Sequence, residues 1–418
     1  MVLFNGPDSP TNNYTTNATM GEISMMALEG LRVLDLTRVL AGPYATMILA
    51  DLGADVVKIE LPGVGDDARS FGPYLHGESA YFMSLNRNKR SMTLNLKSPR
   101  GKQVFCELVP QFDVLVENFR PGTLEKLGLG YETLRDLNPR LIYAASSGFG
   151  RTGPYSRRPA YDAVVQAMGG LMSITGQAGG APTRVGTSIG DITAGLFTAV
   201  GILSALQARA HTGQGQVVDV AMLDCQVAIL ENALARYNVT GEIPRPQGNR
   251  HPSIVPFEPF ETQDGQLMVA AGNDALWKRL CDALERPELA ADPHFETNPL
   301  RNTHYAELRP ILAEIFQQRT TADWQTLLET AGIPVSPINN IAQVSEHPQV
   351  LAREMLVKLA HPVAGEMTVP GIPIKLSETP GTLRTAAPVL GEHTEALLAE
   401  FLHYTPEQIT ELRSEGAL

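Results

Sequence analysis

Apolar and polar residues follow a recognisable order in the first part of the chain. The run LRVLDLT at 31–37 is β-branched and leucine-rich, which predicts a strand. Gly42-Pro43 then opens a helix, because proline suits a first turn whose N–H groups lack partners. Apolar residues between 45 and 52 give that helix one buried face. The run ADVVKIE at 54–60 predicts a second, parallel strand, so the segment is a βαβ unit.

The alternation of strands and helices continues to about residue 225. This pattern is typical of a parallel sheet with helices on both faces. LIYAAS, within 137–150, predicts a strand that ends in a glycine-rich loop, and 215–224 predicts another strand before a helix at 224–237. Residues 240–260 hold five prolines, so we interpret them as a linker.

The pattern beyond the linker predicts a smaller α+β domain. FETQDGQLMVAAGN at 260–273 predicts a hairpin that turns at Asp264-Gly265. Helices are expected near 274–285, 304–318 and 321–331, strand-like residues at 365–377, and a helix at the end of the chain. The resulting division is a disordered lead (1–27), a large domain (28–235), a linker (236–259), a small domain (260–335) and a return segment (336–418). The lead has no basic start followed by an apolar core, so it does not predict a secretory signal.

Composition narrows the function. The 418 residues carry a net charge of −12, which argues against nucleic acid or an anionic membrane as the main partner. No run reaches the ~18–20 apolar residues of a membrane span. Three scattered cysteines and nine histidines show no metal-ligand spacing, so we expect neither disulfides nor a metal site, and a cytoplasmic location. The turn at 40–43 is not G-x-G-x-x-G, so a dinucleotide cofactor is not indicated.

Six later segments accompany the first βαβ unit in a fixed order. They are NRNKRSMTLNLKSPRGK (86–102), DVLVENFRPGTLEKLGL (113–129), GDITAGLFTAVGILSAL (190–206), TGQGQVVDVAMLD (212–224), AGIPVSPI (331–338) and GEHT (391–394). Together they resemble the class III CoA-transferases of the CaiB/BaiF type, the family of formyl-CoA:oxalate and carnitine CoA-transferases.

The resemblance implies both an architecture and a reaction. The expected fold is α/β: a Rossmann-like parallel sheet in a large domain built from both chain ends, a smaller α+β domain, and two chains interlocked as a dimer. The expected substrates are an acyl-CoA and a small carboxylic or dicarboxylic acid, with no permanently bound cofactor. An aspartate attacks the thioester and carries the acyl group and then CoA in turn.

The resemblance also implies a set of CoA contacts. NRNKRS borders the CoA phosphates in the family, and the pair Asn-Phe lies along the CoA. The turn after the first strand contributes through its backbone, and Lys126 stands where an arginine is common, which keeps the charge but loses a bidentate donor. The expected contacts are Val39, Arg87, Asn88, Lys89, Arg90, Asn118, Phe119 and Lys126.

The catalytic carboxylate is less simple to assign. The resemblance places it in T-G-x-x-D-G-x-P, which is TGQAGGAP at 175–182 here, so Gly179 stands at the nucleophile position. Asp191 and Asp162 are the candidates to replace it, although each is also placed to cap a helix. Alternatively the chain is a CoA-binding subunit that lacks a nucleophile, in a heterodimer with a paralogue.

Two further readings complete the expectations. A racemase acting on 2-methylacyl-CoA is less favoured, because Tyr161 and Gly179 stand where that branch has its two bases. In the linker, Arg250 and His251 are expected to meet the carboxylate of the acceptor, since arginine makes bidentate pairs with carboxylates.

Overall fold

The computed structural model describes residues 25–418, and its centre is a six-stranded parallel sheet. The strand order is β5-β2-β1-β6-β7-β8, and all five neighbouring pairs run parallel. The strands are β1 (Arg32–Asp35), β2 (Asp55–Glu60), β5 (Lys89–Thr93), β6 (Val114–Glu117), β7 (Ile142–Ser147) and β8 (Val217–Ala221). The predicted α/β class and the first βαβ unit are confirmed.

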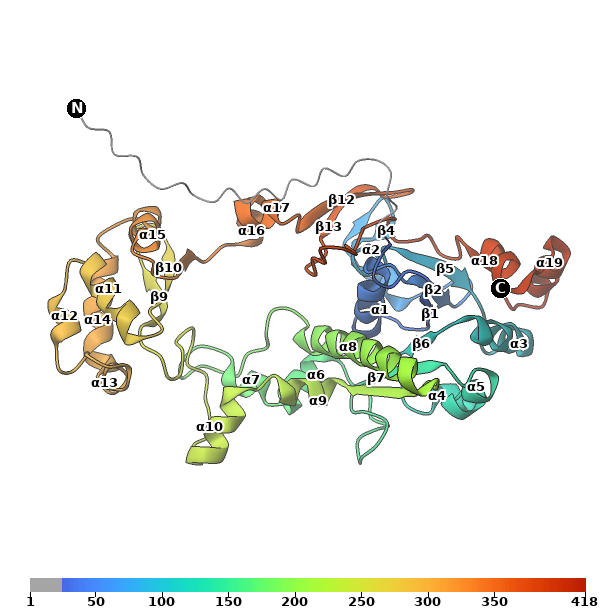
Figure 1. Ribbon diagram of the computed structural model, residues 1–418, viewed down its shortest axis with the longest axis horizontal. Helices are drawn as coiled ribbons and strands as arrows, with labels where there is room; N and C mark the ends of the chain where they lie inside the picture. The colour runs from blue at the N-terminus through green and yellow to red at the C-terminus, as the bar shows by residue number, and fades with distance from the viewer. Residues whose placement is uncertain (1–24) are drawn as a thin grey trace.

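Helices cover both faces of this sheet (Figure 1). On one face, α1 (Ala41–Asp51) and α8 (Ile189–Thr212) pack on a cluster that includes Val33 and Ile142. The other face packs against α3 (Pro99–Leu108), α5 (Tyr131–Leu137), α18 (Thr394–Leu402) and α19 (Pro406–Ser414). Both ends of the chain therefore build the large domain, because Leu397 and Leu412 share a core with Leu34.

The helices α1 and α8 approach closely because one glycine allows it. A Cβ at Gly195 would lie 2.7 Å from the carbonyl oxygen of Ala41. Of the helices described, α8 is long and apolar enough to cross a membrane by length and composition, but its inner face packs on α1 and the sheet, as in many soluble proteins.

The small domain has its own core. Its sheet is antiparallel, in the order β11-β10-β9, and the hairpin predicted at Asp264-Gly265 joins β9 to β10. Trp277, Phe260 and Leu308 are among the buried residues that unite sheet and helices. The elements are β9 (Phe257–Glu261), β10 (Gln266–Ala270), α11 (Asp274–Ala283), α12 (Glu288–Ala291), α13 (Asn298–Thr303), α14 (Tyr305–Phe316), α15 (Thr321–Thr330) and β11 (Val335–Pro337).

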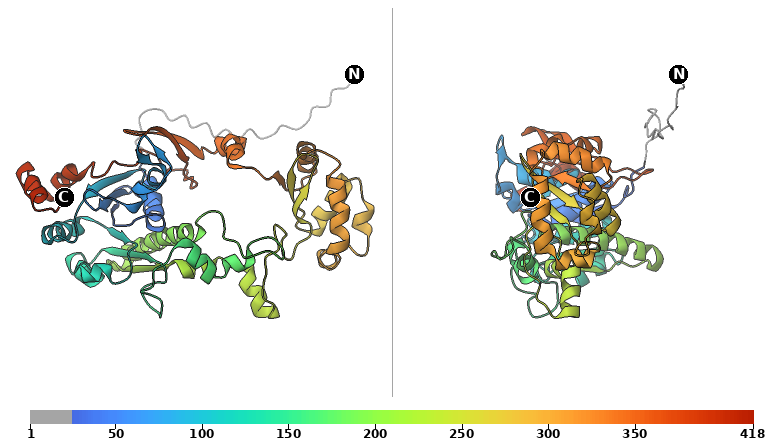
Figure 2. Two further views of the ribbon diagram at one scale, coloured as in Figure 1. Left: turned by 180° about the vertical axis from the view of Figure 1, so that it is seen from behind. Right: turned by 90° about the vertical axis from the view of Figure 1, so that its left-hand side faces the viewer.

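Two separate connections join the domains, and the small domain lies at one end of an elongated molecule (Figures 1 and 2). The outgoing connection follows α9 (Met222–Ala228) and α10 (Asn232–Thr240), and the returning one carries α16 (Ile341–Glu346), α17 (Pro348–Ala352), β12 (Leu356–His361) and β13 (Gly365–Pro370). The shorter elements of the large domain are η1 (Asp67–Ser70), β3 (Tyr74–Leu75), β4 (Glu78–Ser79), α2 (Ala80–Leu85), η2 (Val109–Gln111), α4 (Thr123–Lys126), α6 (Asp162–Met168) and α7 (Leu171–Ile174).

Two local expectations are corrected. The helix expected at 224–237 is two helices, because Glu231 takes a φ of 46°, which a right-handed helix cannot accommodate. Of the stretch 365–377 that was expected to be strand-like, only Gly365–Pro370 forms a strand. Pro370 and Pro373 have no backbone N–H to donate to a neighbouring strand, so the sheet does not continue beyond them. Most of the lead expected at 1–27 lies outside the described residues.

Candidate functional site

A cavity of about 280 Å³ opens at the carboxyl edge of the central sheet. Its walls come from the ends of β1, β2, β5 and β6, which supply Thr37, Glu60, Lys97 and Phe119 among others. The chain leaves β1 toward β2 on one side and later returns to β6 on the other, so the strand order reverses here. Ligands of open α/β sheets bind at such switch points.

Two cations and one aromatic ring face this cavity. Arg38 follows β1 directly, and its guanidinium carbon lies 5.5 Å from the centre of the Phe119 ring. Arg38 is about half exposed and pairs with Asp67 at 3.1 Å. Lys97 is exposed at the same cavity. This combination suits a phosphate-bearing ligand with an aromatic base.

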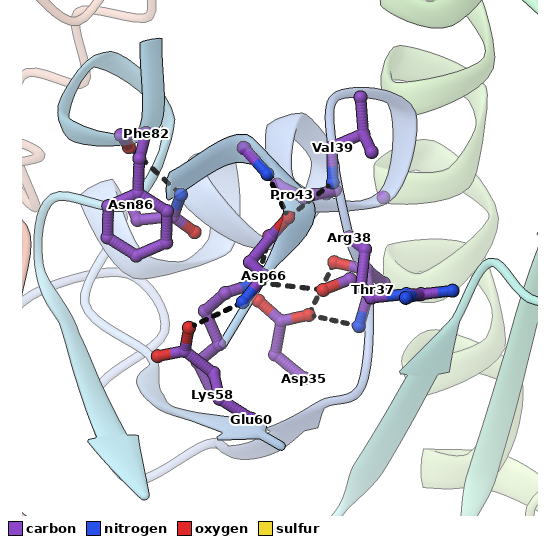
Figure 3. Close-up of polar contacts among 12 residues, drawn as sticks. Asp35, Thr37, Arg38, Val39, Pro43, Lys58, Glu60, Asp66, Phe82 and Asn86 are labelled. Carbon is purple, nitrogen blue, oxygen red and sulfur yellow. Dashed lines mark hydrogen bonds and ion pairs between the residues drawn. The ribbon is translucent and has the colours of Figure 1, made fainter. Parts of the chain in front are cut away.

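The turn that carries Arg38 is held from two sides, and Figure 3 shows the side at Asp66. Val39 adopts a φ of 67°, which is uncommon for a β-branched residue. Its N–H donates to Asp66 at 3.0 Å, while the N–H of Arg38 donates to Asn118 at 2.9 Å. Asn118 returns a hydrogen bond to the Arg38 carbonyl at 2.8 Å. The predicted residues Val39 and Asn118 thus shape the backbone beside the cavity, and Phe119 lines it.

Below this turn lies a buried cluster of charges. The Lys58 ammonium is 2.8 Å from Asp66 and donates to the Thr37 carbonyl at 2.7 Å. Lys89 pairs with Asp35 at 3.1 Å. Burial alone would raise the pKa of Asp35, but the charges of Lys89 and Lys58 outweigh it and lower the pKa to about 2. The cluster is therefore ionised and fixes the floor of the cavity.

The segment NRNKR does not face the cavity. Arg87 pairs with Asp51 at 2.7 Å, Asn88 donates to the same carboxylate at 2.8 Å, and both are buried. Lys89 forms an ion pair with Asp35, and Arg90 forms ion pairs with Asp55 and Glu400. In this chain the side chains of Arg87, Asn88 and Lys89 bind the buried carboxylates of Asp51 and Asp35, so phosphate contacts from these residues and from Arg90 stay a prediction.

Lys126 also lies apart from the cavity. It ends the short helix α4, whose Thr123 and Leu124 line the cavity together with Leu127. Lys126 itself is exposed and is not among the lining residues. The cations that do line the cavity are Arg38 and Lys97, which the motifs did not single out. Their place directly after strands was the available signal.

Two carboxylates meet at the start of α8. Asp162 accepts the N–H of Gly190 at 2.8 Å and the side chain of Gln166 at 2.8 Å, so it caps the first turn of α8 from a neighbouring helix. Asp191 lies in that same turn. Burial, and then the charge of Asp162, raises the pKa of Asp191 to about 7. Asp162 was expected to cap its own helix, but the start of α6 has no side-chain cap hydrogen bond, and the carboxylate of Asp162 binds the first turn of α8 instead.

Tyr81 connects this carboxylate pair to the cavity. Its pKa is raised to about 12 by burial and then by the charges of Asp191, Asp66 and Asp162. The phenol therefore lies within electrostatic reach of both the cavity floor and the start of α8. The sequence motifs did not point to Tyr81.

Gly179 lies in an exposed loop away from these groups. It has a φ of 72°, and a Cβ added there would meet no atom within 4 Å. A side chain at this position would be strained and would point into open space in the single chain.

A second cavity, of about 490 Å³, lies where the linker meets the small domain. Arg250 lines it, stacked 3.6 Å from the centre of the Tyr305 ring, together with Arg309 and Gln177. The Nε atom of Arg250 is buried without a hydrogen-bond partner among the described residues. His251 instead packs against Phe257 at 5.3 Å and accepts the N–H of Ser253. Only Arg250 of the predicted pair lines this cavity.

Comparison with known proteins adds independent findings. The sequence profile described as CoA-transferase family III matches residues 28–394. The acetyl-CoA:oxalate CoA-transferase of Acetobacter aceti is 47% identical over 89% of this chain and 95% of that protein. The human succinyl-CoA:glutarate CoA-transferase is 41% identical over 100% of this chain and 95% of that protein.

Solved structures agree with the sequence matches. A CAIB/BAIF family protein from Brucella suis superimposes with a TM-score of 0.81 at 40% identity, covering 90% of this chain and 100% of that chain. The Rv3272 protein of Mycobacterium tuberculosis superimposes with a TM-score of 0.80 at 33% identity, covering 89% of this chain and 99% of that chain.

Proposed function

The chain belongs to CoA-transferase family III, and on this premise we propose that it moves CoA from an acyl-CoA to a small dicarboxylic acid. Relatives at 38–47% identity are named for transfer to oxalate, glutarate, mesaconate or citramalate. These acceptors share two carboxylates. The chain is accordingly a CoA-transferase, and the dicarboxylate is the finer part of the proposal.

The CoA is proposed to bind in the cavity at the switch point. Arg38 and Lys97 supply positive charge for its phosphates, and Phe119 supplies a flat apolar surface. The hydrogen bonds that the backbone N–H groups of Val39 and Arg38 donate to Asp66 and Asn118 support this assignment, because they fix the turn that presents Arg38. A net charge of −12 makes such local cations necessary for binding a polyanion.

The observation that carries the proposal is Asp191, a largely buried carboxylate at the start of α8. Its carboxylate attacks the thioester carbonyl, the C–S bond breaks, and an anhydride forms as CoA thiolate leaves. The thiolate then attacks the Asp191 carbonyl of the anhydride, which releases the donor acid and forms an aspartyl-CoA thioester. The acceptor carboxylate attacks that thioester and expels the thiolate, which then attacks the acceptor carbonyl. Acyl-CoA is released and Asp191 is regenerated.

The other charged groups have supporting roles in the proposal. Asp162 holds the first turn of α8 through the N–H of Gly190, and its charge keeps the pKa of Asp191 high. Arg250, with its unpaired Nε, is the proposed contact for the distal carboxylate of the acceptor. His251 is proposed only to support the conformation of the linker, since its ring binds Ser253.

We propose a homodimer as the working unit. The outer face of α8 exposes Leu196, Phe197, Val200 and Leu203 at helical spacing, which is costly for a lone chain in water. A cytoplasmic location is proposed from the three free cysteines of the described residues, which suit a reducing compartment.

Trapping of the covalent intermediate tests the proposal. The purified chain is incubated with succinyl-CoA, quenched with hydroxylamine, and digested for mass spectrometry. We expect a hydroxamate on Asp191, and transfer to glutarate or oxalate that falls by at least about 10³-fold in Asp191→Asn. Asp136→Asn, on the exposed face of α5, is the matched control.

Two other outcomes would each replace part of the proposal. A hydroxamate on another carboxylate would move the nucleophile. Activity that requires a co-expressed paralogue would favour the alternative of a subunit without a nucleophile.

A further inference from the structure

Two histidines and a glutamate converge on the outside of the small domain. The Nδ1 atom of His294 lies 3.0 Å from one carboxylate oxygen of Glu307, and the Nδ1 atom of His304 lies 3.0 Å from the other. The two imidazole rings are parallel within 9°, with centres 4.1 Å apart. All the possible ligand atoms lie within 4.8 Å of one another.

These distances fit one metal ion. Two atoms that bind the same transition metal at ~2.1 Å lie about 3.0–3.4 Å apart, so the nitrogen–oxygen separations need little adjustment. In the stack the two nitrogen lone pairs lie in parallel planes, so one ring must turn before both nitrogens can bind one ion, and the side chain of His294, which is 55% exposed, has room to do so. Two imidazoles and one carboxylate form a ligand set that suits Zn²⁺, with water completing the coordination.

The backbone holds the three ligands in place. His304 precedes α14 and Glu307 lies in its first turn, so the pair has the i, i+3 spacing of ligands on one helical turn. His294 comes from a separate turn, where its N–H donates to Asp292 at 2.8 Å and the next residue, Phe295, is buried in the domain core. The site therefore joins two anchored segments.

The protonation states suit a cation as well. Each histidine needs only to move its proton from Nδ1 to Nε2 to offer a lone pair.

From this geometry we propose that His294, His304 and Glu307 form a binding site for a divalent transition-metal ion. The site clamps the start of α14 to the 292–297 turn. The first turns of α14 also carry Tyr305 and Arg309, which line the second cavity. A bound ion would thus fix the helix end that presents those two side chains.

The proposal differs from the sequence-based expectation of no metal site. Histidine spacing alone could not reveal it, because nine residues lie between His294 and His304, among them the helix α13. Only the fold brings the two turns together.

Zinc titration of the full chain tests the site. The protein is treated with EDTA, dialysed, and titrated with ZnCl₂ by isothermal calorimetry at pH 7.5. We expect one ion per chain, and an affinity about tenfold or more weaker in His294→Gln and Glu307→Gln, since each variant loses one of three ligands. His211→Gln, which removes an exposed histidine at the end of α8, should bind Zn²⁺ like the wild type.

A melting measurement makes the test independent of calorimetric heat. Zn²⁺ should raise the Tm of the wild type and of His211→Gln but not that of His294→Gln, because a ligand that binds only the folded state stabilises it. The absence of Zn²⁺ binding by the wild type, or equal binding by His294→Gln, would overturn the proposal.

Discussion

Asp191, the proposed nucleophile, is partly buried, and burial of a carboxylate that must ionise destabilises the fold. The pKa of its carboxyl is raised to about 7, so the folded chain holds a proton there that the unfolded chain releases near pH 4. Ionisation in the folded state is therefore unfavourable for stability, although the ionised form is the one that attacks a thioester. Reactivity at this residue and stability of the fold are in opposition.

The pH dependence follows from the sign of this shift. A group with a raised acidic pKa destabilises the fold as pH rises from about 4 through about 7, while the reactive fraction of Asp191 grows over the upper part of the same range. We expect kcat to rise with pH through about 7 and then level off. Steady-state kinetics with succinyl-CoA between pH 5.5 and 8.5 measure this. A kcat that is flat across this range would contradict Asp191 as the titrating nucleophile.

Removing the charge should also stabilise the chain. At pH 8, Asp191→Asn should increase the free energy of unfolding by about 1–2 kcal/mol, because a buried ionised carboxylate is replaced by a neutral amide. Urea unfolding at pH 8 and pH 5 measures the difference, which should shrink at pH 5. A variant that loses activity and is also less stable at pH 8 would point to a structural role instead.

Arg38 is the residue whose loss should affect CoA binding most directly. Arg38→Ala should raise the KM for acyl-CoA by about 10–100-fold, since a charge-assisted contact to phosphate is worth about 1.5–3 kcal/mol, with a smaller change in kcat. Initial-rate kinetics at low and high salt measure both constants. Arg135→Ala, at an exposed position on α5, should leave them unchanged.

At the level of elements, the turn between β1 and α1 shows what the sequence can predict and what it cannot. The hydrophobic pattern predicts the strand, the helix and the next strand of this unit, because each follows from local periodicity. It cannot show that Asp66 and Asn118, which come from distant segments, bind the two N–H groups of the turn. Val39 therefore takes a positive φ that no local pattern indicates.

The sequence also could not show which partners the charged side chains of NRNKR (86–90) have. Its charges resemble a solvent-facing anion site, yet their partners Asp35 and Asp51 lie on earlier elements and bury them. Arg38 and Lys97 carry the same charge at the ends of neighbouring strands, and only the sheet order brings them to one cavity. Asp191 could be proposed from the sequence because a carboxylate at a helix start is visible there.

The buried pair of Lys58 and Asp66 is the element-level feature most open to test. Lys58→Met should lower the free energy of unfolding by about 3–5 kcal/mol, because it leaves Asp66 buried without its partner. The double variant Lys58→Met with Asp66→Asn should recover part of that loss. Urea denaturation measures the free energy of unfolding of both variants. A loss below about 1 kcal/mol in the single variant would contradict a stabilising role of the Lys58–Asp66 ion pair beneath the turn.

For the whole molecule, the outer face of α8 is an exposed apolar surface on the large domain. It lies opposite the face that packs on α1, so both sides of one helix are apolar. A second copy of the chain would cover it, and the start of this same helix carries Asp191. The proposed dimer interface and the proposed catalytic residue therefore lie on the same helix.

A charge on this face should prevent association. Val200→Glu should convert the dimer to a monomer, because an ionised carboxylate in an apolar interface has no partner. Light scattering after size exclusion measures the mass. Gln207→Glu, at an exposed polar position of the same helix, should remain dimeric. A wild-type mass equal to one chain would contradict the proposed homodimer.

The shared core of Leu34 with Leu397 and Leu412 affects how the chain is made. This core can be completed only after the last helices have been synthesised. The segment between Leu34 and Leu397 takes about 20–70 s to synthesise at typical ribosomal rates. The part of that sheet face that α18 and α19 will cover stays exposed during that time, although α3 and α5 already pack on the rest and the small domain can close its own core. Ribosome-bound chains should consequently need chaperone protection, and loss of the last thirty or so residues should harm yield in cells far more than an equal deletion in a surface loop.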